Sequence, residues 1–316
     1  MADPSISLIE QMLRTRPVLG APVAHGASAE LKRSIGAFQL TLFGVGATVG
    51  TGIFFVLSVA VPEAGPAVVV SFLIAGLAAG LAALCYAELA SAVPVSGSTY
   101  SYAYTTLGEV VAMGVAACLL LEYGVSTAAV AVGWSEYLNK LLDNFFGHRL
   151  PQALSAAPWG NDSPGLINLP AVILVALCAL LLIRGASESA KVNTVMVLIK
   201  LSVLVMFSAI AFTAFDADRF AEFAPFGVAG IGVAAGTIFF SYIGLDAVST
   251  AGDEVRDPQK SMPKAILAAL VTVTAVYVLV TVAALGAQSW KGFKGQEAGL
   301  AAILDDVTGA RYWGTV

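Results

Sequence analysis

The sequence predicts an all-α integral membrane protein. Of its 316 residues, 58% are hydrophobic and only 12% are charged, whereas soluble domains carry about 25% charged residues. The mean hydropathy is +0.84, and the charged residues gather in short clusters between long apolar runs. These runs reach the length of about 20 residues that a helix needs to cross a bilayer. No basic patch indicates nucleic acid, and the net charge of −5 says little about partners.

Seven apolar runs are long enough to be spanning helices. We expect spans at about 36–61, 66–92, 109–138, 168–184, 191–215, 228–251 and 264–288. If the first span starts at the cytoplasmic side, more Lys and Arg residues face the cytoplasm than the opposite side, as is usual in membrane proteins. The sequence therefore predicts a cytoplasmic N-terminal tail at 1–34 and a transmembrane domain at 35–316, in the cytoplasmic membrane.

The last residues have the composition of the beginning of a further span. The stretch from Ala298 to Val316 is polar and then turns aromatic at Tyr312 and Trp313, which is typical of a membrane interface. We therefore expect the sequence to be a fragment that stops before or at an eighth helix.

No residue pattern indicates an enzyme, a metal site or a cofactor site. Cys85, Cys118 and Cys178 lie inside apolar runs without the spacing of metal ligands, and we expect them to be buried as small hydrophobic residues. His25 and His148 lie in polar segments. The sequence predicts neither catalytic residues nor a bound cofactor.

The first span contains a glycine-rich stretch from Gly44 to Phe54. Each glycine in a helix costs about 1 kcal/mol relative to alanine, and within hydrocarbon a broken helix is tolerated only where its backbone is buried in protein or lines a cavity. A half-helix that starts near Thr51 would present free N–H groups and a partial positive charge to a carboxylate. Gly46 and Gly50 also have the spacing of a helix-packing motif, which remains a second interpretation.

A second interruption is predicted in the sixth span, near Ile243 and Gly244. A break there would leave the carbonyl groups of Phe240, Ser241 and Ile243 unpaired, as acceptors for an ammonium group, and Asp246 would cap the following half-helix. Two interrupted segments in matching positions of two halves indicate a transporter site. A zwitterion fits both breaks, with its carboxylate at the first and its ammonium group at the second.

Two ionisable side chains lie inside predicted spans. Lys200 is about nine residues from the start of its span, roughly 13 Å at about 1.5 Å per residue. A charged side chain this deep in the membrane is costly and usually functional, so we predict that Lys200 carries protons. The alternative is that its side chain reaches back to the membrane interface. Glu122 is predicted to contact the substrate or a backbone break, and a structural hydrogen bond is the other interpretation.

Several motifs together resemble those of amino acid permeases. They are Gly46-Ala-Thr-Val-Gly-Thr-Gly-Ile-Phe54, Pro94-Val-Ser-Gly-Ser-Thr-Tyr-Ser-Tyr102 and Phe239-Phe-Ser-Tyr-Ile-Gly-Leu-Asp-Ala-Val-Ser-Thr250. The loop Asp253-Glu-Val-Arg-Asp-Pro-Gln-Lys-Ser-Met-Pro263 is similar to that of the cationic amino acid transporter branch of the amino acid–polyamine–organocation superfamily. The resemblance implies the LeuT-type fold of two inverted five-helix repeats. The first repeat and the start of the second would be present, with about seven transmembrane helices.

The resemblance also implies which residues contact the substrate. It assigns the substrate carboxylate to the backbone N–H groups of Thr51 and Gly52, and the amino group to carbonyl groups near Thr48, Phe240 and Ile243. With the residues singled out above, the predicted substrate-binding set is Thr48, Gly50, Thr51, Gly52, Glu122, Phe240, Ser241 and Ile243.

Lys200 matches the fifth-helix lysine that bacterial members of the branch use in place of a sodium ion, whereas animal members tend to have asparagine there. The resemblance therefore implies a bacterial-type symporter of L-amino acids and protons that works by alternating access. An exchanger without proton coupling and a permease-like amino acid sensor are the alternatives. Because bacterial members also carry neutral amino acids, the branch does not define the substrate. The family's eighth helix, which faces Lys200, would be missing, so we expect that this fragment does not transport.

Overall fold

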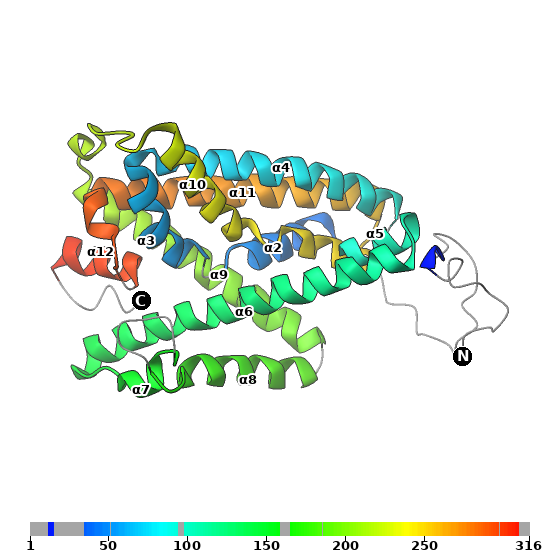
Figure 1. Ribbon diagram of the computed structural model, residues 1–316, viewed down its shortest axis with the longest axis horizontal. Helices are drawn as coiled ribbons and strands as arrows, with labels where there is room; N and C mark the ends of the chain where they lie inside the picture. Colours follow the sequence, from blue (N-terminus) through cyan, green and yellow to red (C-terminus); the bar gives the residue numbers. More distant parts are fainter. Residues whose placement is uncertain are drawn as a thin grey trace. The chain divides into compact units, whose positions relative to one another are not determined.

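The computed structural model describes residues 12–15, 35–50, 52–93, 98–158, 165–184, 186–296 and 298–309, without the side chains of 184, 186–194, 252 and 253. Within these ranges all the regular elements are helices, apart from two isolated β-bridges (Figure 1). The α-helices are α2 (Ala37–Thr48), α3 (Gly52–Ala64), α4 (Val68–Ala92), α5 (Ser98–Thr106), α6 (Glu109–Phe146), α7 (Gln152–Ser155), α8 (Leu169–Arg184), α9 (Ala186–Ala211), α10 (Gly227–Phe239), α11 (Pro258–Ala287) and α12 (Gly299–Thr308).

Short 3-10 helices join or extend several of these elements. They are η1 (Gly65–Ala67), η2 (Phe212–Ala214), η3 (Ala217–Phe220), η4 (Phe240–Tyr242), η5 (Leu245–Glu254) and η6 (Trp290–Phe293). Pro66 lies in the first turn of η1, where its missing N–H group costs no hydrogen bond. Because η1 directly joins α3 to α4, the chain stays helical from Gly52 to Ala92.

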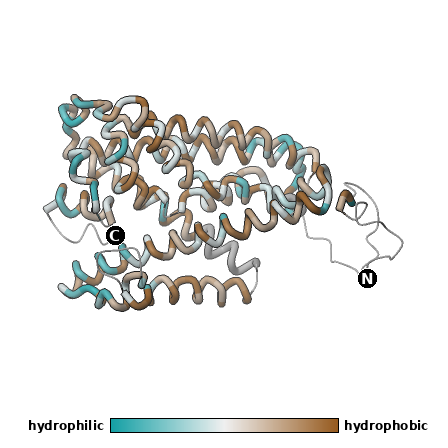
Figure 2. Tube along the Cα trace, viewed as in Figure 1, coloured by the Kyte–Doolittle hydropathy of each residue, from teal (hydrophilic) through white to brown (hydrophobic). Residues whose placement is uncertain are grey.

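The described helices confirm an all-α protein of the membrane-spanning type. Five helical stretches are long and apolar enough to cross a bilayer: Gly52–Ala92, Glu109–Phe146, Val195–Ala214, Gly227–Ala251 and Pro258–Ala287. The shorter apolar helices Ala37–Thr48 and Leu169–Ile183 correspond to the beginning of the first predicted span and to the fourth. Apolar residues dominate along the helices, and polar residues gather at the turns between them (Figure 2).

The chain forms two compact units. The first contains residues 1–44, 80–125 and 244–270, and the second contains 45–79, 126–243 and 271–316. Within the first unit, α5 packs against η5. In the same unit the N–H group of Ile35 donates to the carbonyl oxygen of Glu254, and that of Arg256 donates to Ile35. These hydrogen bonds tie the residues before α2 to the end of η5.

In the second unit, α3 packs against α10 more extensively than against any other element of that unit (Figure 1). The contact is close because Gly230 of α10 has no side chain: a Cβ atom there would lie 2.3 Å from the carbonyl oxygen of Glu63. The Ser71 hydroxyl donates to the carbonyl oxygen of Ile231 at 2.9 Å. The fully buried side chains of this unit include Phe72, Phe207, Ile238 and Tyr277.

The expectation that the three cysteines are buried is wrong. Cys85, Cys118 and Cys178 are free and exposed on the surfaces of α4, α6 and α8. An apolar residue on a spanning helix need not enter a protein core, since its apolar surroundings are supplied by lipid.

Candidate functional site

The first helix break lies where the glycines predict it. Helix α2 ends at Thr48 and α3 begins at Gly52, with Val49 and Gly50 outside both helices. The N–H group of Gly50 turns back and donates to the carbonyl oxygen of Thr48 at 2.8 Å. Thr51, which the sequence places in the site, lies outside the described residues.

Helix packing by itself does not explain the glycines of this stretch. A Cβ atom added to Gly50 would meet none of the described atoms within 4 Å, so this residue is not needed for a close helix contact. Gly44, in contrast, is tightly packed: its Cβ atom would lie 2.5 Å from Val248 and 3.0 Å from Ala269. The packing motif Gly46-x-x-x-Gly50 is therefore not supported at its second glycine.

The side chain of Lys200 points to the first break. Its ammonium group donates to the carbonyl oxygen of Gly46 at 3.0 Å and also to that of Val49. Gly46 lies in the last turn of α2 and Val49 directly follows this helix, where the last carbonyl groups lack helical partners and the helix dipole favours a cation. Lys200 is half-buried on α9 and bonds protein carbonyls, so the structure does not favour the alternative of a lysine that reaches the interface.

The second helix break also lies where it is predicted. Helix α10 ends at Phe239, and the chain continues through η4 to Gly244, which has a φ of +100°. This left-handed conformation favours glycine because it has no Cβ atom. The N–H group of Ile243 donates to the carbonyl oxygen of Phe240 at 3.2 Å. The carbonyl group of Phe240 is therefore paired, contrary to the expectation.

A buried tyrosine joins the two breaks. The hydroxyl group of Tyr277 on α11 lies 2.9 Å from the carbonyl oxygen of Thr48 and 3.0 Å from that of Ser241. A tyrosine hydroxyl has one proton, so the two carbonyl groups share a single donor. The expectation that Ser241 offers a free carbonyl is thus wrong. Tyr277 is not among the residues predicted from the sequence, although a hydroxyl group in the middle of an apolar span is a signal that indicates it.

The N-terminus of α3 faces the side chain of Ser241. A Cβ atom on Gly52 would lie 3.0 Å from the Ser241 hydroxyl oxygen and 3.3 Å from its Cα atom. Ser241 is 3% exposed, and within the described parts of the chain its hydroxyl group has no hydrogen-bond partner. A buried hydroxyl group without a partner costs free energy unless a ligand or water satisfies it. The first turn of α3 and this hydroxyl together form a donor-rich site for an anionic group.

Glu122 and Asp246 both belong to the first unit. The Tyr123 hydroxyl donates to a carboxylate oxygen of Asp246, and the Ser98 hydroxyl donates to the same oxygen at 3.4 Å. The expectation that Asp246 caps the segment after the second break is wrong. The cap residue of η5 is Gly244, and among the described residues no side chain caps this helix. Glu122 is exposed on α6, and its substrate role stays a prediction.

Comparisons with known proteins agree with the motifs. The profile of the family "amino acid permease" matches residues 35–316. The chain is 43% identical over 279 residues to the methylthioribose transporter of Bacillus subtilis, which covers 88% of this chain and 60% of the relative. It is 40% identical over 294 residues to the branched-chain amino acid permease BcaP of the same organism, covering 93% of this chain and 63% of the relative.

A plant relative extends the comparison to the branch that the sequence motifs indicate. The chain is 37% identical over 257 residues to the chloroplastic cationic amino acid transporter 9 of Arabidopsis thaliana, covering 78% of this chain and 44% of the relative. The chain thus spans less than two thirds of the length of these curated relatives. The matched profile and these identities show that the chain belongs to the amino acid permease family of the amino acid–polyamine–organocation superfamily.

Proposed function

We propose that the whole protein containing this chain transports L-amino acids across the cytoplasmic membrane, with its N-terminus in the cytoplasm. One observation carries the proposal: the N-terminus of α3 at Gly52 faces the hydroxyl group of Ser241, which is buried and has no partner among the described residues. A carboxylate fits this site because free N–H groups, a partial positive charge and a hydroxyl donor all favour an anion. The N–H groups of Thr51 and Gly52 and the hydroxyl group of Ser241 are the proposed donors.

The amino group of the substrate would lie near the C-terminal end of α2 and the second break. The backbone around Thr48, Gly50, Phe240 and Ile243 supplies carbonyl groups there, and the dipole at the end of α2 favours a cation. Tyr277 already donates to the carbonyl group of Thr48, so an incoming ammonium group would share or displace that donor. A contact of Glu122 with the substrate stays a prediction from the sequence.

Lys200 is the proposed proton carrier. Its ammonium group donates hydrogen bonds to two carbonyl groups at and just after the end of α2. These bonds stabilise the backbone conformation at the first break fully only while the amine carries its proton. Loss of the proton would remove the charge and at least one donor, and would free this end of α2 to move. Proton release would thereby be coupled to movement of a helix that binds the substrate, as alternating access requires.

A second candidate substrate comes from the relative with 43% identity, the methylthioribose transporter of Bacillus subtilis. Methylthioribose is a neutral sugar thioether, so it has neither a carboxylate for the N-terminus of α3 nor an ammonium group for the end of α2. The site therefore favours a zwitterion over this compound.

Uptake into proteoliposomes of the whole protein tests the function. Labelled leucine, alanine, arginine and methylthioribose are each offered with and without an inward proton gradient. We expect gradient-driven accumulation of at least one amino acid and its loss in Lys200→Ala. Uptake of methylthioribose without any amino acid would overturn the zwitterion site. Amino acid uptake that ignores the gradient and survives Lys200→Ala would favour the exchanger, and binding without uptake would favour the sensor.

A further inference from the structure

Helix α8 is short for a helix that crosses a bilayer. Its 16 residues, Leu169–Arg184, extend about 24 Å at about 1.5 Å per residue, whereas the hydrocarbon core is about 30 Å thick. The large apolar side chains of Val172, Leu177 and Leu180 are exposed, as expected of a helix that faces lipid. Residues beyond the ends of α8 must therefore supply the remaining apolar length, or the bilayer must become thinner around this helix.

Apolar side chains continue beyond the N-terminal end of α8. Leu166 and Ile167 lie in the loop that leads into this helix, and both are exposed, Leu166 to 76%. Leu154 of the short helix α7, in the same loop, is exposed as well. We call these three side chains the loop patch. At the other end of the loop, Phe145 and Phe146 of α6 expose their rings, and aromatic side chains are typical of the zone where lipid meets water.

The backbone of this loop pairs its polar groups within the loop. The N–H groups of Leu166 and Ile167 both donate to the carbonyl oxygen of Ala153, at 2.9 and 3.1 Å. The N–H group of Gly165 donates to the carbonyl oxygen of Ala157 at 2.8 Å. These bonds hold α7 beside the N-terminal end of α8 (Figure 1). A loop paired in this way can enter a region that is poor in water, where unpaired backbone groups would be costly.

Asn168 closes the loop at the start of α8. Its backbone pairs with that of Ser155 in an isolated antiparallel β-bridge. Its side-chain oxygen accepts a hydrogen bond at 3.2 Å from the N–H group of Ala171, in the first turn of α8. A helix begins with N–H groups that have no partner inside the helix, and this cap satisfies one of them without water.

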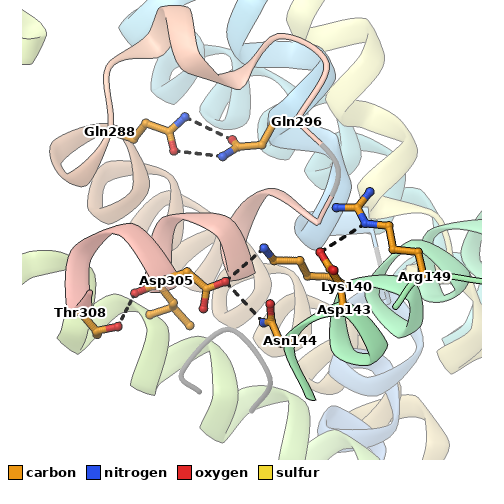
Figure 3. A network of polar contacts seen from close by, with 9 residues as sticks. Lys140, Asp143, Asn144, Arg149, Gln288, Gln296, Asp305 and Thr308 are labelled. Atoms are coloured by element: carbon orange, nitrogen blue, oxygen red, sulfur yellow. Dashed lines mark hydrogen bonds and ion pairs between the residues drawn. The ribbon is translucent and has the colours of Figure 1, made fainter. Parts of the chain in front are cut away.

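Charged side chains at the start of the loop limit how deep it can lie. The guanidinium group of Arg149 is 3.3 Å from a carboxylate oxygen of Asp143, in the last turn of α6 (Figure 3). Both side chains are partly exposed. A basic side chain of this kind can keep its stem against apolar groups while its charge stays among headgroups and water. The loop is therefore compatible with the headgroup region and not with the hydrocarbon core.

We infer that the loop between α6 and α8, described at 147–158 and 165–168, is a lipid-binding surface that lies in the headgroup region of the bilayer, with the loop patch toward the acyl chains. The patch continues the lipid-facing surface of α8, and lipid there would remove its exposed apolar side chains from water. The inference goes beyond the proposed function and holds for any substrate.

Spin labels test the depth of the loop. Leu154→Cys and Leu166→Cys are made singly in the whole protein after its native cysteines are replaced by alanine. Each variant is spin-labelled and reconstituted in vesicles of phosphatidylethanolamine and phosphatidylglycerol. Collision rates with oxygen, which concentrates in the bilayer, and with a water-soluble nickel chelate together give the depth of the label. We expect both labels about 5–10 Å below the boundary of headgroups and acyl chains, the depth typical of interfacial segments.

Two positions elsewhere in the second unit calibrate the measurement. Leu177→Cys lies in the middle of α8 and should be deeper than either loop label, because its side chain is exposed on the span itself. Lys294→Cys lies in the exposed segment after η6 and should collide freely with the nickel chelate.

Removal of the apolar side chains tests whether they hold the loop in the interface. In Leu166→Ser with Ile167→Ser, we expect the label of Leu154→Cys to move toward water, to about half of its depth or less, since interfacial binding scales with buried apolar area. Phe212→Ser is the matched control, because it removes an exposed apolar side chain of η2, outside the loop. It should leave the depth of the same label unchanged.

Each outcome decides the inference. Free collision of both loop labels with the nickel chelate would place the loop in water and overturn it. Slow collision with both reagents would show that protein covers the patch, either another segment of the whole chain or a second copy, and would also overturn it. An interfacial depth that the double serine variant reduces and Phe212→Ser does not would sustain the lipid contact, even in a protein that moves no amino acid.

Discussion

The hydroxyl group of Tyr277 lies 2.9 Å from the carbonyl oxygen of Thr48, 229 residues away in the sequence. The same hydroxyl group reaches Ser241, so one buried donor serves the ends of two interrupted helices. Movement of either helix end changes this shared hydrogen bond, and the two breaks are therefore mechanically linked through one side chain.

Tyr277→Phe removes this donor and keeps the ring. We expect substrate affinity to fall about five- to hundredfold, since the two helix ends that form the site lose the shared hydrogen-bond donor that holds them together, a loss of about 1–3 kcal/mol. Equilibrium binding of a labelled amino acid to the purified whole protein measures the effect. Tyr242→Phe is the control, because its hydroxyl group bonds Phe72 and Thr274 instead. Equal losses in the two variants would show that Tyr277 acts only through general stability.

Gly52→Ala places a methyl group 3.0 Å from the Ser241 hydroxyl oxygen and 3.3 Å from its Cα atom. One of the two helix ends must shift to accept it, and we expect binding to become undetectable or at least about tenfold weaker, because overpacking typically costs about 1–3 kcal/mol. Gly236→Ala in α10 is the matched control, as its Cβ atom would meet none of the described atoms within 4 Å and the residue is not part of the proposed site. A tolerated Gly52→Ala would argue against the close approach of these elements.

Ser241→Ala separates a binding role from a structural one. Its hydroxyl group has no partner within the described residues, so its removal should leave the melting temperature unchanged or slightly higher. If the hydroxyl group donates to a substrate carboxylate, affinity should still fall about 10-fold, in line with about 1.5 kcal/mol for a hydrogen bond to a charged group. Ser208→Ala, which removes a buried hydroxyl group that bonds Leu204, should instead spare affinity. A melting temperature that drops in Ser241→Ala with unchanged affinity would exclude the binding role.

Lys200→Met removes the ammonium group from the end of α2 and leaves the carbonyl groups of Gly46 and Val49 without this donor. We expect the melting temperature of the purified protein to fall by about 2–8 °C, the shift that a loss of about 1–2 kcal/mol produces in a protein of this size class. Thermal unfolding in detergent measures it, with Lys264→Met, at the start of α11, as the control lysine. No difference between the two would mean that the contact of Lys200 with α2 contributes nothing to stability.

The chain's own residues determine its class, its helices and the positions of its two breaks. Long apolar runs make helices in lipid because every backbone polar group must be paired within the segment. The glycines between Gly44 and Gly52 weaken the first helix locally, and Gly244 allows the left-handed turn of the second. These are local effects of composition and conformation, so the pattern of residues is enough to predict them.

The tertiary structure determines which hydrogen-bond donors pair with the backbone carbonyl groups at the two breaks. The sequence predicts free carbonyl groups at Phe240 and Ser241, whereas the folded chain pairs the first with Ile243 and the second with Tyr277. The fold likewise places the ammonium group of Lys200 at the end of α2. A hydrogen bond between distant residues depends on how helices pack in three dimensions, and a single sequence carries no measure of that packing. The glycines determine where the helices are interrupted, and the fold determines which donors form hydrogen bonds with the backbone at these breaks.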